Sequence, residues 1–227
     1  MRATPIKRTS KRAVAKLARG RHPLTQQAVA DSQRGRLLAA VSTVVSRKGY
    51  SAATVADVIA LAGVSRRTFY EFFPNFEDCY LAAYEHGMRL LLAAIHEAVT
   101  RLPREDWRAR TRAALAAYLE TLAAMPDAAW AYTIEVMGAG RRALQARAWV
   151  TGQWTGQWRT LHARGLTSES APRELDDAQL VALVGGIEEL VRDCLQRRGA
   201  AQLPSLLEPA SCFALAVLAA PGPGSSA

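Results

Sequence analysis

The 227-residue chain (24.6 kDa) is long enough for one domain of ordinary size or two small ones, and half of its residues are hydrophobic, which excludes a disordered chain. Alanine, the best helix former, occurs 44 times, so the composition predicts an all-α fold. The formal net charge of +9 is concentrated at one end: residues 1–75 hold 14 basic and 3 acidic side chains, whereas residues 76–227 hold 15 and 17. This asymmetry indicates a nucleic-acid or anionic-membrane partner for the first third, with a solvated basic tail as the alternative.

The sequence has no pattern typical of an enzyme, a metal site or a secreted protein. It contains no Gly-x-Ser-x-Gly elbow, no His-Glu-x-x-His helix and no phosphate loop with lysine, so we expect no catalytic residue, no metal ligand and no cofactor. Cys79, Cys194 and Cys212 are too far apart for a disulfide framework and suit a reducing cytoplasm. The longest apolar run, residues 212–220, is too short to span a bilayer, so we expect a cytoplasmic protein with no membrane partner.

Three helices are expected in the first third of the chain. The first spans about residues 32–48, where apolar side chains recur at spacings of three and four. The second begins at Thr54, whose hydroxyl is suited to cap the first turn, and it ends at Gly63. The third begins at a further cap residue, Ser65, and is stopped by Pro74.

Two short capped helices joined by Ala-Gly-Val-Ser at residues 62–65 are typical of a helix-turn-helix. Phe69 and Phe73, four residues apart, face inward on the helix that begins at Ser65. The opposite side presents polar side chains that suit a DNA major groove, where arginine reads guanine and threonine meets the thymine methyl group. These candidate DNA-binding residues are Arg66, Arg67, Thr68 and Tyr70.

Residues 54–73, TVADVIALAGVSRRTFYEFF, resemble the DNA-binding signature of the TetR-type (tetracycline-repressor-like) transcriptional regulators, and the similarity covers about residues 32–85. The resemblance implies a three-helix DNA-binding head, a long linking helix, and a helical body that binds a small molecule and dimerises. It also implies that Thr54 meets a DNA phosphate, that Ser65 caps the recognition helix, and that the four polar residues face the groove. The chain departs from the family in having Phe76 where a phosphate-contacting lysine is usual and Cys79 where a core leucine is usual.

Further helices are expected after Pro74, because prolines and cap residues divide the rest of the chain into helix-length segments. No segment shows the alternating apolar pattern of strands. The expected helices span about residues 75–101, 105–125, 127–137, 139–164, 176–198 and 208–219.

Aromatic side chains in the body are candidates for the lining of an apolar ligand cavity between helices, with plain core packing as the alternative. Gly152 and Gly156 interrupt one of these helices, and we expect close packing at both positions to offset their poor helix propensity. The candidate cavity residues are Trp107, Tyr118, Trp130, Tyr132, Trp149, Trp154 and Trp158.

The last two expected helices have apolar faces too broad for a helix that is covered on one side only. Pairing both helices with a second copy gives a four-helix interface with two-fold symmetry, and completion of the chain's own core is the alternative. The candidate interface residues are Leu183, Ile187, Leu190, Phe213, Leu215 and Leu218.

Four regions are therefore predicted: a basic flexible arm (1–30), a helix-turn-helix DNA-binding domain (31–75), a helical effector-binding and dimerisation domain (76–220), and a disordered tail (221–227). The expected protein is a homodimeric transcriptional regulator, in the first instance a repressor, that binds a palindromic double-stranded DNA operator and is released by a small apolar effector. The alternative is a sequence-tolerant, chromosome-associated DNA-binding protein whose helical body recruits a protein partner.

The basic arm leads to a first testable prediction. Residues 1–22 carry eight Lys and Arg side chains and no acid, and among them Arg19 and Arg21 are candidate DNA-binding residues. Each DNA phosphate that is neutralised steepens the log–log salt dependence of binding by about 0.9, so a dimer that engages half of these charges should lose a slope of roughly 7 when residues 1–22 are deleted. Operator affinity measured from low to moderate salt checks this, and parallel lines for the full and truncated chains would show that the arm does not contact DNA.

Overall fold

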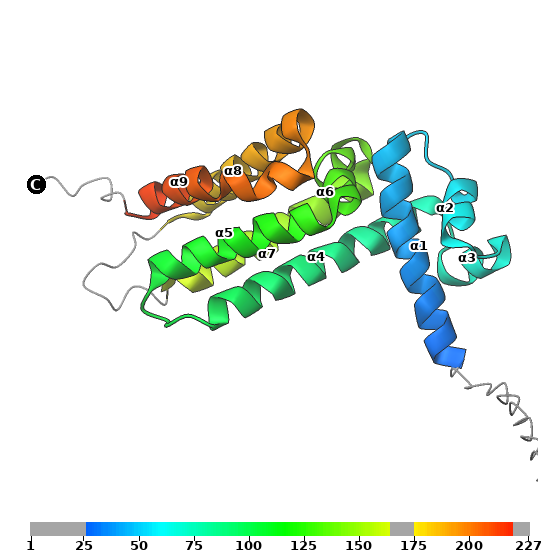
Figure 1. Ribbon diagram of the computed structural model, residues 1–227, viewed down its shortest axis with the longest axis horizontal. Helices are drawn as coiled ribbons and strands as arrows, with labels where there is room; N and C mark the ends of the chain where they lie inside the picture. Colours follow the sequence, from blue (N-terminus) through cyan, green and yellow to red (C-terminus); the bar gives the residue numbers. More distant parts are fainter. Residues whose placement is uncertain (1–25, 164–174, 220–227) are drawn as a thin grey trace, which may run out of the picture.

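The computed structural model describes residues 26–163 and 175–219, and all regular elements within these ranges are helices, as the sequence predicted (Figure 1). Predictions that concern residues 1–25, 164–174 and 220–227, among them the roles of Arg19 and Arg21, lie outside the described residues. The elements are α1 (Gln26–Lys48), α2 (Val55–Ala62), α3 (Arg66–Phe72), α4 (Phe76–Thr100), α5 (Trp107–Ala124), α6 (Pro126–Thr133), η1 (Glu135–Gly138), α7 (Arg141–Ala163), α8 (Asp177–Arg198), η2 (Ala200–Leu206) and α9 (Leu207–Ala219).

Three boundaries differ from those expected. Helix α1 begins six residues earlier than predicted, so residues 26–30 are helical rather than part of a flexible arm; this first stretch has no apolar stripe that periodicity could detect. The helix expected at 127–137 is two elements, α6 and the 3-10 helix η1. The 3-10 helix η2 was not predicted, because it contains Pro204, which is read from sequence as a helix stop.

Helices α1, α2 and α3 form a compact head whose turns are held by local polar contacts. Thr54 and Asp57 form a reciprocal capping box at the start of α2, and Ser65 accepts a hydrogen bond from the amide of Thr68 at the start of α3. Between the two helices, Gly63 adopts the left-handed conformation (φ 62°) that glycine tolerates best. Arg36 of α1 donates to the carbonyl of Ala62 at 2.9 Å, which ties α1 to the end of α2.

The remaining helices form an elongated body that joins the head at one end (Figure 1). Helices α4, α5 and α7 run along its length, and α8 and α9 lie along one side. At the near end, α1 packs against both α4 and α6. The buried apolar side chains of head and body belong to one continuous cluster, so the two parts share a core.

One stretch, Ala200–Ala219, is apolar and long enough by composition to cross a membrane. It consists of η2 and α9, and both elements pack against α5 and α8 through buried side chains such as Leu203, Leu206 and Leu218. Core helices of other proteins have the same length and hydropathy, so we interpret the stretch as part of the helical body.

Candidate DNA-binding head and effector cavity

Helix α3 presents the side chains that the sequence assigned to DNA reading. Arg66, Arg67 and Tyr70 are exposed, whereas Thr68 is half-buried. The Arg66 guanidinium lies over the Tyr70 ring, 5.8 Å from its centroid. One residue further on, Arg67 Nε is 3.0 Å from a carboxylate oxygen of Glu71, one turn later. Phe69 and Phe73 are buried beneath, so α3 is anchored by its apolar side and shows its cationic side to solvent.

The N-terminus of α2 lies beside the end of α1 and is already well bonded. The Thr54 hydroxyl donates to Asp57 at 2.7 Å, and Lys48 Nζ lies 2.5 Å from the same carboxylate. The Lys48 ammonium, and secondly the Thr54 hydroxyl, hold the pKa of Asp57 below its usual range, so this carboxylate stays ionised. The Thr54 hydroxyl is therefore already bonded to Asp57, and the predicted contact between Thr54 and a phosphate has to form with that hydrogen bond in place.

The two departures from the family pattern have structural uses at the start of α4. Phe76 packs edge-to-face on Tyr50, with ring centroids 5.5 Å apart, and so covers the junction of α1 and α4. Cys79 is buried in the core, and burial raises the pKa of its thiol to about 12. Between these two positions, Glu77 and Asp78 form ion pairs with Arg142 of α7, at 2.9 Å and 2.7 Å. The pairs fix the first turn of α7 to the first turn of α4.

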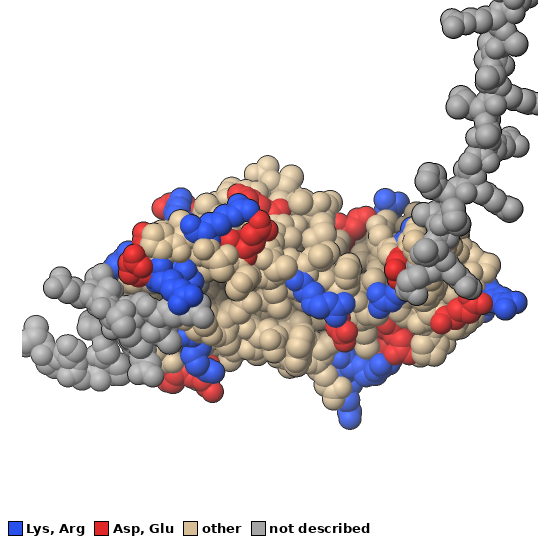
Figure 2. Space-filling view, turned by 90° about the horizontal axis from the view of Figure 1, so that it is seen from below, with Lys and Arg blue, Asp and Glu red and all other residues tan. Residues whose placement is uncertain are grey.

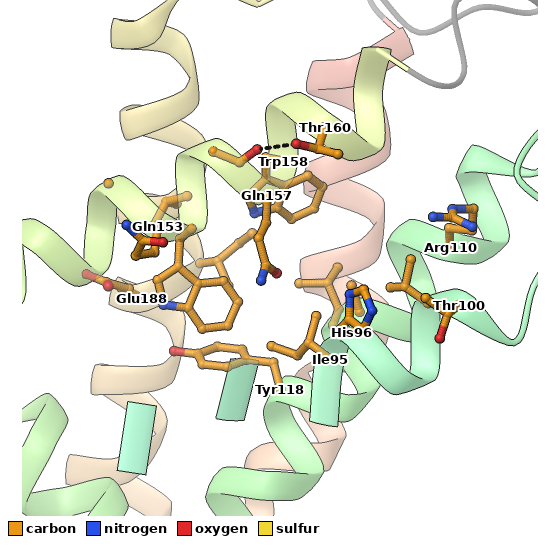
Figure 3. Close-up of a pocket in the computed structure, with 18 residues that line it drawn as sticks. Ile95, His96, Thr100, Arg110, Tyr118, Gln153, Gln157, Trp158, Thr160 and Glu188 are labelled. Atoms are coloured by element: carbon orange, nitrogen blue, oxygen red, sulfur yellow. Dashed lines mark hydrogen bonds between the residues drawn. The ribbon is translucent and has the colours of Figure 1, made fainter. Parts of the chain in front are cut away.

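A cavity of about 330 Å³ lies in the body between α4, α5, α7 and α8 (Figure 3). This volume is at the lower end of the range for small-molecule sites. Tyr118 and Trp154 meet edge-to-face at 5.1 Å, and Gln157 reaches into the space between Trp158 and Tyr118. The further lining residues are Ile95, His96, Val99, Thr100, Arg110, Ala114, Leu115, Gly152, Gln153, Gly156, Thr160, Val184, Ile187 and Glu188.

The cavity combines an apolar and aromatic wall with a few polar groups. Glu188 is paired with Arg147, an ion pair that joins α8 to α7 and leaves little net charge at that end. Arg110 is only 3% exposed and donates to the carbonyl of Leu102 at 3.2 Å. Burial raises the pKa of Tyr118 above its ordinary value, so its hydroxyl remains a neutral donor. Such a site suits a largely apolar ligand with a small polar group.

Only part of the predicted aromatic lining is present at this cavity. Tyr118, Trp154 and Trp158 line it, whereas the other four residues lie elsewhere. Trp107 is buried under Arg108 at the start of α5, and Trp149 is 55% exposed on the outer face of α7. The indole of Trp130 donates to Glu135 at 3.2 Å, and Tyr132 lies at the junction of head and body, so these two side chains belong to α6 and its contacts with α1. Aromatic type alone could not tell these environments apart.

The glycines of α7 also differ from the expectation. A Cβ atom added at Gly152 or Gly156 would meet no atom within 4 Å, so no neighbouring backbone packs closely there. Both glycines line the cavity, where the absence of a side chain widens the space. The expected close packing is instead found at Gly186 of α8, whose added Cβ would lie 2.9 Å from the Phe213 ring of α9.

The predicted interface residues fall into two groups. Leu183, Ile187 and Leu218 are buried within the chain itself, as in the alternative of a completed core, and leave almost no surface for a second copy. Each of α8 and α9 uses one side for the chain's own core, and only the opposite side is left for a partner. Phe213 is 39% exposed on that side, with Leu190 and Leu215 half-buried; Val181, which the sequence analysis missed, is 52% exposed.

Charged side chains of both signs are interspersed over the face shown in Figure 2, rather than gathered in one patch. Within residues 26–163 and 175–219, no group of three or more His, Cys, Asp or Glu side chains is placed to hold a metal ion.

Comparison with known proteins finds a family match in the head. Residues 37–83 match the family described as "Bacterial regulatory proteins, tetR family". The chain is 33% identical over 90 residues to the HTH-type transcriptional activator FasR of Mycolicibacterium smegmatis, and the match spans 40% of each chain.

The similarity to solved structures extends through the body. The fatty acid degradation regulator FadR of Bacillus halodurans has a TM-score of 0.72 at 20% identity, covering 80% of this chain and 97% of the other. FadR of Bacillus subtilis in complex with stearoyl-CoA has a TM-score of 0.71 at 17% identity, covering 81% and 98%. At these identities the likeness shows a shared fold.

The exposed arginines of α3 lead to a prediction about base reading. Replacing Arg66 or Arg67 by alanine should weaken specific binding by about 1–3 kcal/mol if that arginine reads a guanine, and should relax base preference at one position of the site. Equilibrium binding to a set of single-base variants of the site checks this. Full affinity with unchanged preference in both variants would contradict the assignment of α3 as the reading helix.

Proposed function

Since this chain carries the DNA-binding head of the tetR family of bacterial regulatory proteins, we propose that it is a homodimeric transcriptional regulator that binds a palindromic operator. The observation that carries the proposal is the geometry of α3: a Ser65-capped helix with a buried aromatic side and an exposed side bearing Arg66, Arg67 and Tyr70. A helix of this kind fits the major groove with its N-terminal residues toward the bases. The comparisons favour this function over a sequence-tolerant chromosome-associated protein.

The proposed effector site is the cavity between α4, α5, α7 and α8. Its aromatic wall, its neutral amide and hydroxyl groups and the paired Glu188 support a mainly apolar ligand with a polar end. Stearoyl-CoA is bound in the Bacillus subtilis FadR structure, and its stearoyl chain is the kind of apolar group that such a wall suits, so we propose a long-chain acyl compound as the effector class. We propose repression as the mode of action and the cytoplasm as the location, with no catalytic role.

The proposed dimer face is the solvent side of α8 and α9. Val181 and Phe213 are exposed there, and Ala182 and Gly185 are small exposed residues of α8 that allow a second helix to approach closely. Trp149 is a further exposed aromatic side chain on α7, which packs against α8. Two copies related by a two-fold axis would present two heads to successive turns of the DNA major groove.

Selection from a random pool of duplexes tests the function directly. The full-length protein should enrich a palindromic sequence and bind it about 10³-fold or more tightly than random DNA at the same salt concentration. A promoter fusion that carries this sequence then reports whether the protein lowers or raises transcription. If selection enriches no sequence, the proposed operator-binding function is wrong.

The effector class is tested with stearoyl-CoA and with coenzyme A alone as the control. Stearoyl-CoA should weaken operator binding by about 5- to 150-fold, the usual range of allosteric coupling, and coenzyme A should not. The variant Gly156→Leu should abolish this response while leaving operator binding intact, because the added side chain enters the cavity at a position with no atom within 4 Å. An unchanged response in Gly156→Leu would place the ligand elsewhere.

The dimer face generates a further prediction. Sedimentation of the native protein should give about twice the chain mass, and Val181→Glu should give a monomer, because it buries a carboxylate without a partner at the interface. Leu90→Glu is the matched control, since Leu90 is a similarly exposed apolar residue on α4. A native monomer at micromolar concentration, or a dimer that survives Val181→Glu, would refute this face.

A further inference from the structure

The head is bonded to the body through a short segment, α6 with η1, that takes no part in the cavity lining. Three polar contacts join this segment to α1 and to Tyr50, two residues beyond the end of α1. They are Ser42 Oγ with Tyr132 Oη at 2.5 Å, Thr43 Oγ1 with Asp127 Oδ2 at 2.7 Å, and the Tyr50 amide with Glu135 Oε2 at 2.9 Å. Since α1 packs on α2, and α2 packs on α3, the position of α1 sets the position of the recognition helix.

The contact between Tyr132 and Ser42 is the most buried of the three, and its direction can be assigned. Ser42 has a single hydroxyl proton, which it donates to the carbonyl of Leu38 at 3.0 Å. The Tyr132 hydroxyl is therefore the donor to Ser42. Burial raises the pKa of Tyr132 to about 12, so this donor keeps its proton throughout the physiological pH range.

The ring of the same tyrosine rests on α4 at Gly87. A Cβ atom added at Gly87 would lie 2.7 Å from Tyr132 Cε2, so only glycine leaves room for the ring at this position. Tyr84, on the preceding turn of α4, holds the ring from another side in an edge-to-face contact at 5.4 Å. Tyr132 thus touches α4 with its ring and α1 with its hydroxyl, and a shift of α4 at Gly87 displaces a side chain bonded to the head.

Helix α4 connects this contact to the cavity. Its residues Ile95 and Val99 line the cavity two to three turns beyond Gly87. Ile95 lies nineteen residues along the helix, or about 28 Å, from Phe76 at the head. We propose that Tyr132 is a positioning residue that sets the angle of the DNA-binding head, and that Gly87 is the point where movement of α4 reaches it. This inference rests on the proposed function, in which a ligand in the cavity alters operator binding.

The variant Gly87→Ala tests the contact without any ligand. The added methyl group must displace the Tyr132 ring, and so the variant should weaken binding of the selected operator duplex by about tenfold, within the usual range of allosteric coupling. Gly138→Ala is the matched control, because Gly138 belongs to η1 and an added Cβ there meets no atom within 4 Å. The control should bind the duplex as the native protein does.

Two substitutions of the tyrosine separate its ring from its hydroxyl. In Tyr132→Phe the ring stays and the bond to Ser42 is lost, and in Tyr132→Leu the ring is also removed. Gly87→Ala should have less than about a twofold effect on operator affinity in either background, because coupled residues are not additive. In the Tyr132→Leu background it should also raise the melting temperature, since alanine is favoured over glycine within a helix once the clash is gone.

Amide hydrogen exchange of the DNA-free protein supplies a readout that does not depend on the operator. Gly87→Ala should speed exchange in residues 126–133 and in α1 near Ser42, and Gly138→Ala should not. Equal effects of Gly87→Ala on operator affinity in the native, Tyr132→Phe and Tyr132→Leu backgrounds would overturn the proposed roles of Gly87 and Tyr132. Unchanged exchange in both segments would overturn them as well. Failure to select any duplex would instead refute the proposed function, and the exchange comparison would still decide whether Gly87 and Tyr132 are coupled to α1.

Discussion

The continuity of α4 is the constraint on which the rest of the structure depends. Its 25 residues form one uninterrupted helix of about 37 Å, with successive turns tied by backbone hydrogen bonds, so the two ends cannot move independently. One end carries Phe76 and Cys79 at the edge of the head, and the other supplies Ile95 and Val99 to the cavity wall. Head and cavity therefore share a rigid element, and the ion pairs of Arg142 with Glu77 and Asp78 attach α7 to the same end.

The basic side chains of the first third are divided unevenly between the residues before α1 and the head. Residues 26–75 hold six basic and three acidic side chains, whereas residues 1–25 hold eight basic side chains and no acid. Within the head, Arg36 and Lys48 are engaged with a backbone carbonyl and with Asp57. Under the proposed function, attraction toward DNA thus comes mainly from the residues that precede α1, and the base contacts come from α3.

Local chemistry explains why the head was predicted well from sequence. Cap residues such as Thr54 and Ser65, and the glycine at 63, act through neighbours within four residues, so their roles are visible in the sequence itself. The cavity and the partner face depend on which side of each helix meets the core, a property of packing between distant segments. Leu183 and Leu218 have the apolar side chains expected of interface residues, yet both are buried in the chain's own core. Trp149, as aromatic as Trp158, is exposed only because α7 turns that side outward.

The two glycines of α7 that border the cavity have a consequence for how this protein can diverge. Neither has an atom within 4 Å of the position a side chain would occupy, and neither belongs to the helices of the α1–α6 junction. Each position has open space beside it in the cavity wall. Successively larger side chains there would reduce the cavity volume stepwise without disturbing the head. Alanine at either position would also favour the helix, so narrowing the cavity meets no opposition from backbone stability. Under the proposed function, ligand preference can therefore drift by single substitutions while the same DNA sequence continues to be read.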